Sequence, residues 1–340
     1  MSLSDLKKSD IDVIYLDCLD PFFNLACEEY LTKNTKSPIF MLWQNSPCVV
    51  LGRGQNAQNE INENFVRDNH ITICRRISGG GAVFHDLGNV NFTFIFPENE
   101  KKIDFPKFVS PICDAISKLS DKKATLSGRN DIILDGQKVS GNAQCHLNGN
   151  VMHHGCILWD ADLSKLAGAL NPDPSKLSKK GIKSVKSRVG NIKDITESDM
   201  NENEFINFLF SNVVPDTEPR RLTTEEIKQT EMLKNEKFAT SEWIWGKDSK
   251  AKYRFSNRFD YGKVEIAFNL ENDRICDLSI SGDFFGSRDS DELAKLLNGK
   301  KINELDAHFT NVGEYIHKAK PEDIKNLFCS ALTADNFILR

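Results

Sequence analysis

The stretch that decides the fold runs from Ile71 to Phe96 and has the sequence ITICRRISGGGAVFHDLGNVNFTFIF. Its first four residues predict a strand, and residues 75–81 predict a connecting loop. Residues 82–85 resume extended structure. From Val90 onward an apolar side chain recurs at every second position, which is the period of a strand with one strongly apolar face. We therefore expect strands on both sides of a glycine-rich loop.

On either side of this stretch the sequence predicts a meander of strands with helices outside it. Asp135-Gly136 and Asn148-Gly149 are typical of tight hairpin turns. Strand-like runs lie at residues 40–43, 48–51, 132–134, 138–144 and 151–159. Helical patterns lie at residues 105–119, 204–213 and 224–234. This irregular order favours an α+β fold, with a large mixed or antiparallel sheet flanked by helices, over regular βαβ units.

Two prolines bear on the helices. Asp20-Pro21 predicts a helix start, because an Asp cap is followed by Pro at the first helical position. Pro111 lies inside the helical pattern at residues 105–119. That helix therefore either kinks at Pro111 or begins at a Ser110 cap.

The length of 340 residues is enough for two domains. We expect residues 1–246 to form the larger domain and the polar residues 247–253 to form a linker. Residues 254–340 are expected to form a small α+β accessory domain. Its strands are predicted at residues 263–270 and 274–281, and leucines at helical spacing follow near residues 293–297 and 324–328.

Composition excludes several classes of protein. Of the residues, 39% are apolar and 27% charged, which excludes a disordered or fibrous chain. No apolar run approaches the roughly 18 residues that a membrane span needs, and no secretory signal is visible. A net charge of −5 argues against a nonspecific nucleic-acid binder. Nine singly scattered cysteines are typical of reduced thiols. We expect a cytoplasmic, monomeric protein that binds neither membrane nor nucleic acid.

The glycine loop is the sharpest candidate for chemistry. Three consecutive glycines, Gly79 to Gly81, let the backbone approach a ligand and turn its N–H groups toward an anion. Arg75 and Arg76 add charge and paired donors suited to phosphate or carboxylate. The alternative interpretation is a hairpin tip with solvated arginines.

Lys138 is a single lysine in a strand of apolar and small residues. Its ammonium either points into a pocket as a compact positive charge or faces outward into solvent.

Five soft metal ligands lie within twelve residues: Cys145, His146, His153, His154 and Cys156. Neighbouring residues of a strand point to opposite faces, so His153 and His154 are not expected to share an ion. We favour a histidine that positions a ligand or satisfies the core.

At these residues the chain resembles the lipoate–protein ligase A family. Residues 75–89, RRISGGGAVFHDLGN, are similar to the signature loop and strand of that family. The resemblance continues through residues 127–131, 138–143, 153–155, 161–163 and 183–189, and it includes Asp20 to Glu29, residues 243–246, residues 262–265 and residues 282–285. One departure is Asn142, which stands where the family has a small residue.

The resemblance implies an enzyme that activates lipoate with ATP and Mg²⁺ to lipoyl-AMP. The lipoyl group then passes to a lysine of an acceptor. The acceptors that the family implies are lipoyl domains of 2-oxoacid dehydrogenase complexes and the glycine-cleavage H protein.

The resemblance also implies roles for individual residues. Lys138 would be the catalytic residue that contacts both the carboxyl oxygen and the α-phosphate. The residues implied for lipoate and lipoyl-AMP are Arg75, Ser78, Gly79, Gly80, His85, Lys138, Gly141, Ala143, His154 and Gly155. Those implied for ATP are Arg76, Gly81, Ala82, Val83, Phe84, Asn130, Asp131, Lys138, Lys183, Ser184 and Arg188. The candidate Mg²⁺ ligand is Asp131.

Two other functions are compatible with the sequence. The first is an octanoyl- or lipoyl-transferase that holds the acyl group as a thioester on Cys145 or Cys156. The second is a non-catalytic sensor that keeps the lipoyl pocket, although no DNA-reading helix-turn-helix is visible to serve it. Replacing both cysteines distinguishes the ligase from the transferase.

Overall fold

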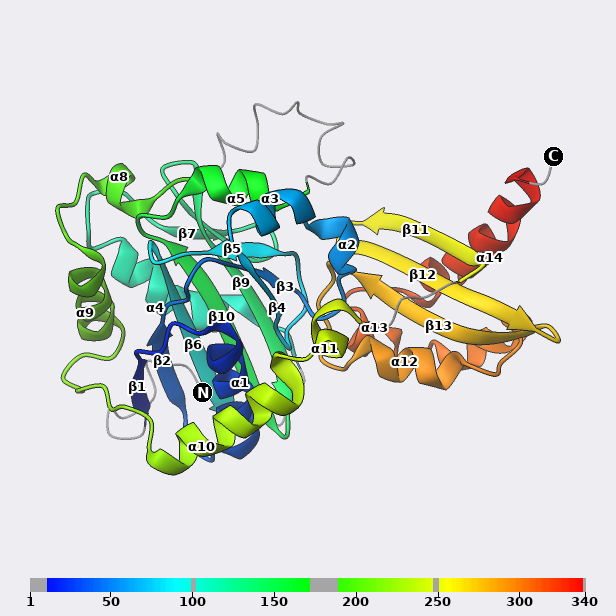
Figure 1. Ribbon diagram of the computed structural model, residues 1–340, viewed down its shortest axis with the longest axis horizontal. Helices are drawn as coiled ribbons and strands as arrows, with labels where there is room; N and C mark the ends of the chain where they lie inside the picture. The colour runs from blue at the N-terminus through cyan, green and yellow to red at the C-terminus, as the bar shows by residue number, and fades with distance from the viewer. Residues whose placement is uncertain (1–10, 99–101, 172–188, 247–250, 339–340) are drawn as a thin grey trace.

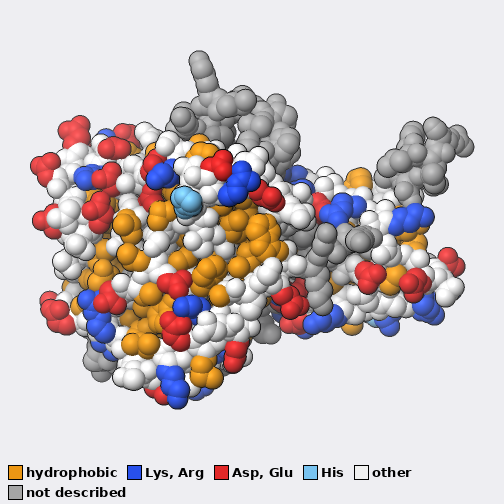
Figure 2. Space-filling view, in the orientation of Figure 1, with side chains coloured by type: hydrophobic (Ala, Val, Ile, Leu, Met, Phe, Trp, Pro, Cys, Tyr) orange, Lys and Arg blue, Asp and Glu red, His pale blue; other side chains and the backbone are white. Residues whose placement is uncertain are grey.

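The computed structural model describes residues 11–98, 102–171, 189–246 and 251–338, with side chains as far as Leu332. Figure 1 shows a larger unit built on a seven-stranded sheet beside a smaller unit built on a three-stranded sheet. On the face seen in Figure 2, acidic and basic side chains are interspersed over both units. Within the described residues, no helix is both long and apolar enough to cross a bilayer.

The large sheet carries the predicted meander. In spatial order its strands are β1 (Asp12–Leu16), β2 (Ile39–Trp43), β6 (Asn89–Pro97), β10 (Asn150–Leu158), β9 (Gln137–Leu147), β8 (Asp131–Leu134) and β7 (Thr125–Ser127). β1 and β2 are parallel, and the other neighbours are antiparallel. The mixed sheet with helices around it confirms the predicted α+β class. β1 was not predicted from the sequence.

Both predicted hairpins are confirmed. Asp135 and Gly136 have φ angles of 50° and 76°, and Asn148 and Gly149 have 52° and 77°. Two successive residues with positive φ match the right-handed twist of the strands they join, which is why these dipeptides are favoured in hairpins. The two turns fix the register of β8, β9 and β10.

Helices cover both faces of the large sheet (Figure 1). On one face α4 (Phe105–Ile116) and α9 (Glu202–Val213) close a core of strand phenylalanines. On the other face lies α1 (Pro21–Asn34), against which α10 (Thr224–Leu233) and the π-helix η3 (Lys234–Phe238) pack. Asp20 caps α1 as predicted, since its Oδ1 accepts the Phe22 N–H at 2.9 Å.

Pro111 lies inside α4, which begins after an Asp104 cap rather than at Ser110. The Asp104 side chain accepts the N–H of Lys107, so the first turn is closed before Pro111 is reached. The helix therefore continues through the proline, and the alternative of a Ser110 start is wrong.

The prediction of one strongly apolar face on β6 is incomplete. Phe92 and Phe94 enter the core under α4, as the alternation indicates. Asn91 and Thr93, on the opposite face, are also buried. Helix α1 and a second, smaller sheet cover that face, and this is the side on which the cavity described below lies.

The second sheet of the larger unit has the order β4 (Thr72–Arg75), β3 (Cys48–Leu51) and β5 (Val83–His85). The glycine loop connects β4 to β5, as residues 71–85 predict. Short helices surround this sheet: α2 (Ala57–Glu60), α3 (Glu63–Asp68), α5 (Leu163–Ala169) and α11 (Ser241–Trp245). A further short helix, α8 (Ile192–Thr196), packs with Ile192 and Ile195 against the core under α4 and α9.

The smaller unit is a three-stranded antiparallel sheet of β11 (Tyr253–Phe259), β12 (Gly262–Glu271) and β13 (Arg274–Gly282). It is covered by α12 (Ser290–Leu297), the 3₁₀ helix η4 (Ile302–His308), α13 (Val312–Tyr315) and α14 (Pro321–Ile338). These elements share an apolar core of their own. Two of its three strands are predicted, and β11 is missed.

Candidate functional site

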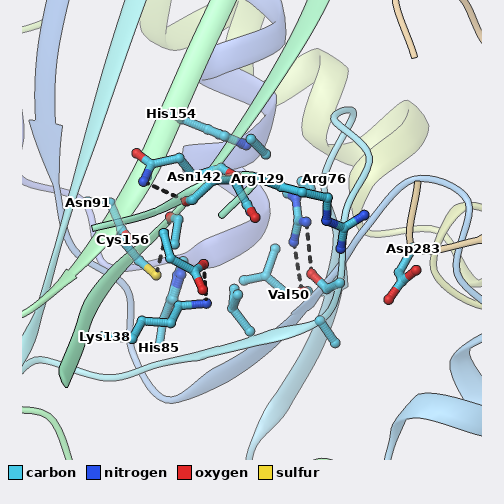
Figure 3. Close-up of a pocket in the computed structure, with 18 of the residues that line it drawn as sticks. Val50, Arg76, His85, Asn91, Arg129, Lys138, Asn142, His154, Cys156 and Asp283 are labelled. Carbon is cyan, nitrogen blue, oxygen red and sulfur yellow. Dashed lines mark hydrogen bonds and ion pairs between the residues drawn. The ribbon is translucent and has the colours of Figure 1, made fainter. Parts of the chain in front are cut away.

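A cavity of about 350 Å³ lies between the large sheet and the small sheet of the larger unit. Figure 3 shows its wall, to which the smaller unit adds Asp283 on the side opposite Lys138. Such volumes are typical of small-molecule sites. The described side chains place no group of three or more His, Cys, Asp or Glu close enough to hold a metal ion.

One transverse row of the large sheet forms the floor of the cavity. The register pairs Trp43 with Asn91, Asn91 with Cys156, Cys156 with Gly141, and Gly141 with Asp131. Residues directly opposite each other in a sheet share a face, so these five positions on five strands face the same side. All five line the cavity.

A register shift brings Lys138 into the cavity. Strict alternation from Gly141 would put Lys138 on the opposite face, three residues away. The pairing of β8 with β9 shifts between Ile132 and Ile133, so that Lys138 lies opposite Ile133, on the face of Asp131. A bulge re-aims a side chain in this way. The structure therefore favours the pocket-facing interpretation of Lys138 over the outward-facing one.

Two neighbours determine where the Lys138 ammonium lies. Its Nζ lies 2.8 Å from Asp131 Oδ1. A Cβ on Gly141 would come within 3.2 Å of the same Nζ. The glycine thus leaves room for the ammonium over the strand, and about a third of the lysine side chain stays exposed to the cavity.

Arg76 is a buried cation in the cavity wall. Its Nε donates to Ser78 Oγ, its Nη1 to Val50 O, and its Nη2 to the carbonyls of Gly79 and Gly81. Desolvation lowers the pKa of Arg76 to about 10, so the group stays charged at neutral pH. None of the described acidic side chains forms an ion pair with it. A buried positive charge that no carboxylate neutralises favours the binding of an anion.

Arg75 does not line the cavity. Its guanidinium donates to five backbone carbonyls, those of Gly52, Arg53, Gln55, Trp243 and Ile244. The indole Nε1 of Trp243 donates back to the Arg75 carbonyl at 2.8 Å. These bonds tie α11 to the root of the glycine loop.

The three glycines have different neighbours. A Cβ on Gly79 would overlap the Phe284 carbonyl, and one on Gly80 would come within 2.8 Å of the Phe285 ring. The Gly80 N–H donates to Phe284 O at 3.1 Å. These two glycines therefore allow close approach of the smaller unit. Gly81 alone lines the cavity, where a Cβ would meet nothing within 4 Å.

Two buried polar side chains line the cavity with unused hydrogen-bonding atoms. His85 Nδ1 lies 3.2 Å from Asn45 Nδ2, which donates to it, while Nε2 has no partner among the described residues. Burial, with a smaller contribution from the Arg76 charge, lowers the pKa of His85 to about 3. The ring is therefore neutral, with its proton on Nε2. Both amide atoms of Asn91 are likewise without a partner in the described part of the chain.

Unsatisfied buried polar atoms are rare and usually mark a water or ligand position. Asn91 was not predicted, although its signal is legible in the sequence: it interrupts a strand whose neighbours are apolar. Arg129, Asn142 and Asp283 also line the cavity without having been predicted for it. Arg129 also donates to the Tyr261 carbonyl of the smaller unit.

His153 and His154 face opposite sides of β10, as the strand period predicts. His153 is completely buried and stacks on Phe108, with ring centroids 5.1 Å apart. Burial holds its pKa well below the ordinary range. His154 faces the cavity, between Ser78 and Glu28.

The two candidate cysteines are separated by the fold. Cys156 lines the cavity, whereas Cys145 lies against α1 and borders a different hollow between the two units. Burial raises the pKa of both thiols. A raised pKa leaves less thiolate, which is the reactive form.

The predicted residues divide into three groups. Those that line the cavity are Arg76, Gly81, Ala82, Val83, His85, Asn130, Asp131, Lys138, Gly141, Ala143, His154 and Gly155. Those placed elsewhere are Arg75, Ser78, Gly79, Gly80 and Phe84. Lys183, Ser184 and Arg188 lie outside the described residues. Val189, where the description resumes, pairs with Lys138.

A cavity lined both by cationic groups and by apolar side chains is suited to an anionic substrate with an apolar chain. Residues 20–213 match the family model described as the lipoyl protein ligase A/B catalytic domain, and residues 249–328 match that of the bacterial lipoate protein ligase C-terminus. The chain belongs to the lipoate–protein ligase family.

Individual relatives agree with this assignment. Lipoate-protein ligase LplJ of Bacillus subtilis is 36% identical over 290 residues, which cover 83% of this chain and 87% of the relative. The crystal structure of P. falciparum LipL1 in complex with lipoate superimposes with a TM-score of 0.76 at 26% identity, covering 94% of this chain and 99% of that one. A bipartite lipoate protein ligase from Thermoplasma acidophilum, studied with its E2 lipoyl domain, has a TM-score of 0.61 at 25% identity, covering 72% and 99%.

Proposed function

We propose that this chain joins lipoate to ATP, forming lipoyl-AMP and pyrophosphate, and then transfers the lipoyl group to a lysine of an acceptor lipoyl domain. The observation that carries the proposal is that two cations, Lys138 and Arg76, line the same cavity as the unused polar atoms of His85 and Asn91. Carboxylate, α-phosphate and developing oxyanion all require such groups.

In the first step a lipoate oxygen attacks the α-phosphorus, and pyrophosphate leaves. Two anions must approach each other, and negative charge spreads over the phosphoryl oxygens. Lys138 serves both partners as a compact charge that contacts a carboxylate oxygen and an α-phosphate oxygen. Arg76 adds a fixed positive field, and because its N–H groups already bind the loop it needs no reorganisation.

The apolar part of the wall takes the aliphatic chain of lipoate. Leu25, Trp43, Val50 and Val83 line it. Burying a methylene of the substrate there contributes about 0.8 kcal/mol. These apolar side chains select the substrate by the length and width of its chain. The polar groups of the cavity determine which end of the substrate meets ATP.

In the second step the amine of the acceptor lysine attacks the acyl carbon of lipoyl-AMP, and AMP leaves. The mixed anhydride is already activated, so the chain supplies orientation and charge rather than a nucleophile of its own. The neutral His85, with a proton on Nε2, is a suitable donor to an oxygen of the adenylate.

The nucleotide contacts are assigned by resemblance, and the ligand of its ion is a separate proposal. Gly81 to Val83, Asn130 and Asp131 would border ATP, together with Lys183, Ser184 and Arg188. Mg²⁺ needs few protein ligands when phosphates supply the others. Asp131, whose carboxylate faces the cavity beside Lys138, fits that requirement. The bound ion would neutralise phosphate charge.

The acceptor is proposed from the same family. Lipoyl domains of 2-oxoacid dehydrogenase complexes and the glycine-cleavage H protein are the candidates. We also propose that residues 1–246 act as the catalytic part and residues 254–340 as an accessory part joined by residues 247–253.

Incubation with ATP, Mg²⁺, lipoate and purified apo-acceptors tests the function directly. We expect one AMP to be released for each acceptor domain that is modified. The intact mass of each modified domain should increase by one lipoyl group. Without acceptor, lipoyl-AMP should remain bound and be visible by mass spectrometry after quenching. Absence of adenylate and of modified acceptor with every candidate domain contradicts the proposal.

A cysteine-dependent transferase is the second candidate, because Cys156 lies in the cavity wall. We expect Cys156→Ser to keep ATP-dependent transfer within about threefold of the parent, since the raised thiol pKa makes this cysteine a poor nucleophile. Cys145→Ser is the matched control outside the cavity. Loss of transfer in Cys156→Ser alone, with an acyl group trapped on the parent thiol, would establish the transferase.

A further inference from the structure

A continuous chain of hydrogen bonds runs from the core of the large sheet to the glycine loop. Trp43 Nε1 donates to Thr93 Oγ1 at 2.9 Å, and Thr93 Oγ1 donates to Glu28 Oε1 at 2.6 Å. The same carboxylate oxygen lies 2.8 Å from His154 Nδ1. His154 Nε2 lies 2.7 Å from Ser78 Oγ.

The chain ends on the buried cation of the site. Arg76 Nε donates to Ser78 Oγ at 3.0 Å. Thr93, Glu28, His154 and Ser78 are hereafter called the relay. They come from β6, α1, β10 and the glycine loop, and each is less than one-tenth exposed. Because all four are buried, their hydrogen bonds to one another take the place of hydrogen bonds to water.

The donors at the two ends are compatible with one direction of donation along the whole chain. Ser78 Oγ accepts from Arg76, so its own hydrogen is free to be donated to His154 Nε2. The His154 proton then lies on Nδ1 and is donated to Glu28. In this assignment every hydrogen bond of the chain has one donor and one acceptor.

A Ser–His–carboxylate order invites comparison with a nucleophilic triad, but the surroundings of Ser78 exclude that use. Its side chain has no exposed surface, and it does not line the cavity. A nucleophilic hydroxyl must reach the reacting carbon. This series of hydrogen bonds is therefore suited to fixing the position of the glycine loop.

The relay holds the Arg76 guanidinium in place and, through it, the glycine loop. Arg76 binds the carbonyls of Gly79 and Gly81, so its position sets the path of the backbone between them. Gly81 and its neighbours line the cavity. A displacement of Ser78 would move both a charge and a wall of the site.

We propose that Glu28, Thr93, His154 and Ser78 are positioning residues, which hold Arg76 and the glycine loop in the geometry required for adenylate formation. Glu28 and Thr93 do not line the cavity, and their role is exerted through His154 and Ser78. The inference rests on the proposed function and goes beyond it by adding residues that need not touch substrate.

Thr93→Val tests the relay with little change of shape, because valine is close to threonine in volume and lacks the hydroxyl. The matched control is Thr32→Val. Thr32 is a fully buried threonine of α1 whose Oγ1 donates to the Glu28 carbonyl at 2.6 Å and takes no part in the relay. Thr32→Val loses one buried hydroxyl hydrogen bond beside the same glutamate, whereas Thr93→Val loses two, the one donated to Glu28 Oε1 and the one accepted from Trp43 Nε1.

We expect kcat for lipoyl-AMP formation to fall about 10–100-fold in Thr93→Val, because a misplaced catalytic group can cost that much. The KM for ATP should change by less than about threefold. Thr32→Val should keep kcat within about twofold, and its melting temperature should fall by less than that of Thr93→Val, because it loses one hydrogen bond instead of two. Thr93→Ser, which restores the hydroxyl, should recover most of kcat.

Ser78→Ala and His154→Gln extend the test if Thr93→Val fails to fold. Ser78→Ala cuts the relay and should lower kcat at least as far as Thr93→Val does. His154→Gln keeps one donor and one acceptor and should retain more activity than His154→Phe. Equal kcat in folded Thr93→Val, Ser78→Ala and Thr32→Val overturns the positioning role. The proposed function is judged separately, by whether the parent chain forms lipoyl-AMP.

Discussion

Lys138→Ala is expected to slow lipoyl-AMP formation by about 10²–10³-fold, the loss typical of removing one transition-state stabiliser. Lys138 forms an ion pair with Asp131 of the neighbouring strand. A register shift between β8 and β9 turns its side chain into the cavity. The effect should fall mainly on kcat, because charge on the phosphoryl oxygens grows as the α-phosphate is attacked.

The measurement is pyrophosphate release in a single turnover with saturating ATP and lipoate. A matched control exists in Lys122→Ala. Lys122 forms a comparable pair with Asp135 at 3.0 Å and has a similar exposure, 37% against 34% for Lys138, but lies outside the cavity. Loss of an exposed pair costs about 0–1 kcal/mol of stability, so both variants should stay folded. Similar rates in the two variants would rule out the catalytic assignment of Lys138.

Gly52→Ala is expected to cost about 100-fold in kcat/KM, although this residue does not line the cavity. A Cβ at this position would overlap the Gly80 carbonyl oxygen and approach the Arg76 guanidinium to 3.3 Å. The obstacle is backbone, which cannot rotate away as a side chain can. The glycine loop must therefore shift, and overpacking of this kind typically costs about 1–3 kcal/mol of folding stability.

Gly54→Ala is the control two residues along the same turn. There a Cβ would come no closer than 3.4 Å to the Gly282 carbonyl, an ordinary contact. We expect its kcat/KM and urea midpoint to match the parent. A Gly52→Ala enzyme with parental kcat/KM would show that the loop tolerates displacement, and it would remove the structural reason for the glycine.

Much of the fold could be predicted because its signals are local. Asp20-Pro21 starts α1, and the Asp-Gly and Asn-Gly turns fix the hairpins. The missed strands have weaker signals. β1 is a short run at the start of the described chain, and its partner β2 lies beyond the whole of α1. Pairing between distant segments leaves no trace in either segment alone.

The site was predicted less completely, and the reasons are specific. No periodicity shows that Lys138 faces the cavity, because the bulge in β9 reverses the alternation. Gly79 and Gly80 were assigned to a ligand, yet their lack of a side chain makes room for Phe284 and Phe285 more than two hundred residues away. Arg75 is a residue type suited to binding an anion, but its guanidinium donates to backbone carbonyls instead. In each case a tertiary contact decided between two uses of the same residue.

The transverse row from Trp43 to Asp131 also limits where residues can be inserted into the sequence. A single residue inserted into one of these strands would turn its cavity side chain toward the phenylalanine core and its core side chain toward the cavity. Such an insertion removes a wall of the site and a part of the core at once. Insertions should therefore be tolerated at the hairpin tips, Asp135-Gly136 and Asn148-Gly149, and be disfavoured within the five strands of the row. Among diverged sequences, the spacing from Asp131 to the first tip should vary less than the length of the tip itself.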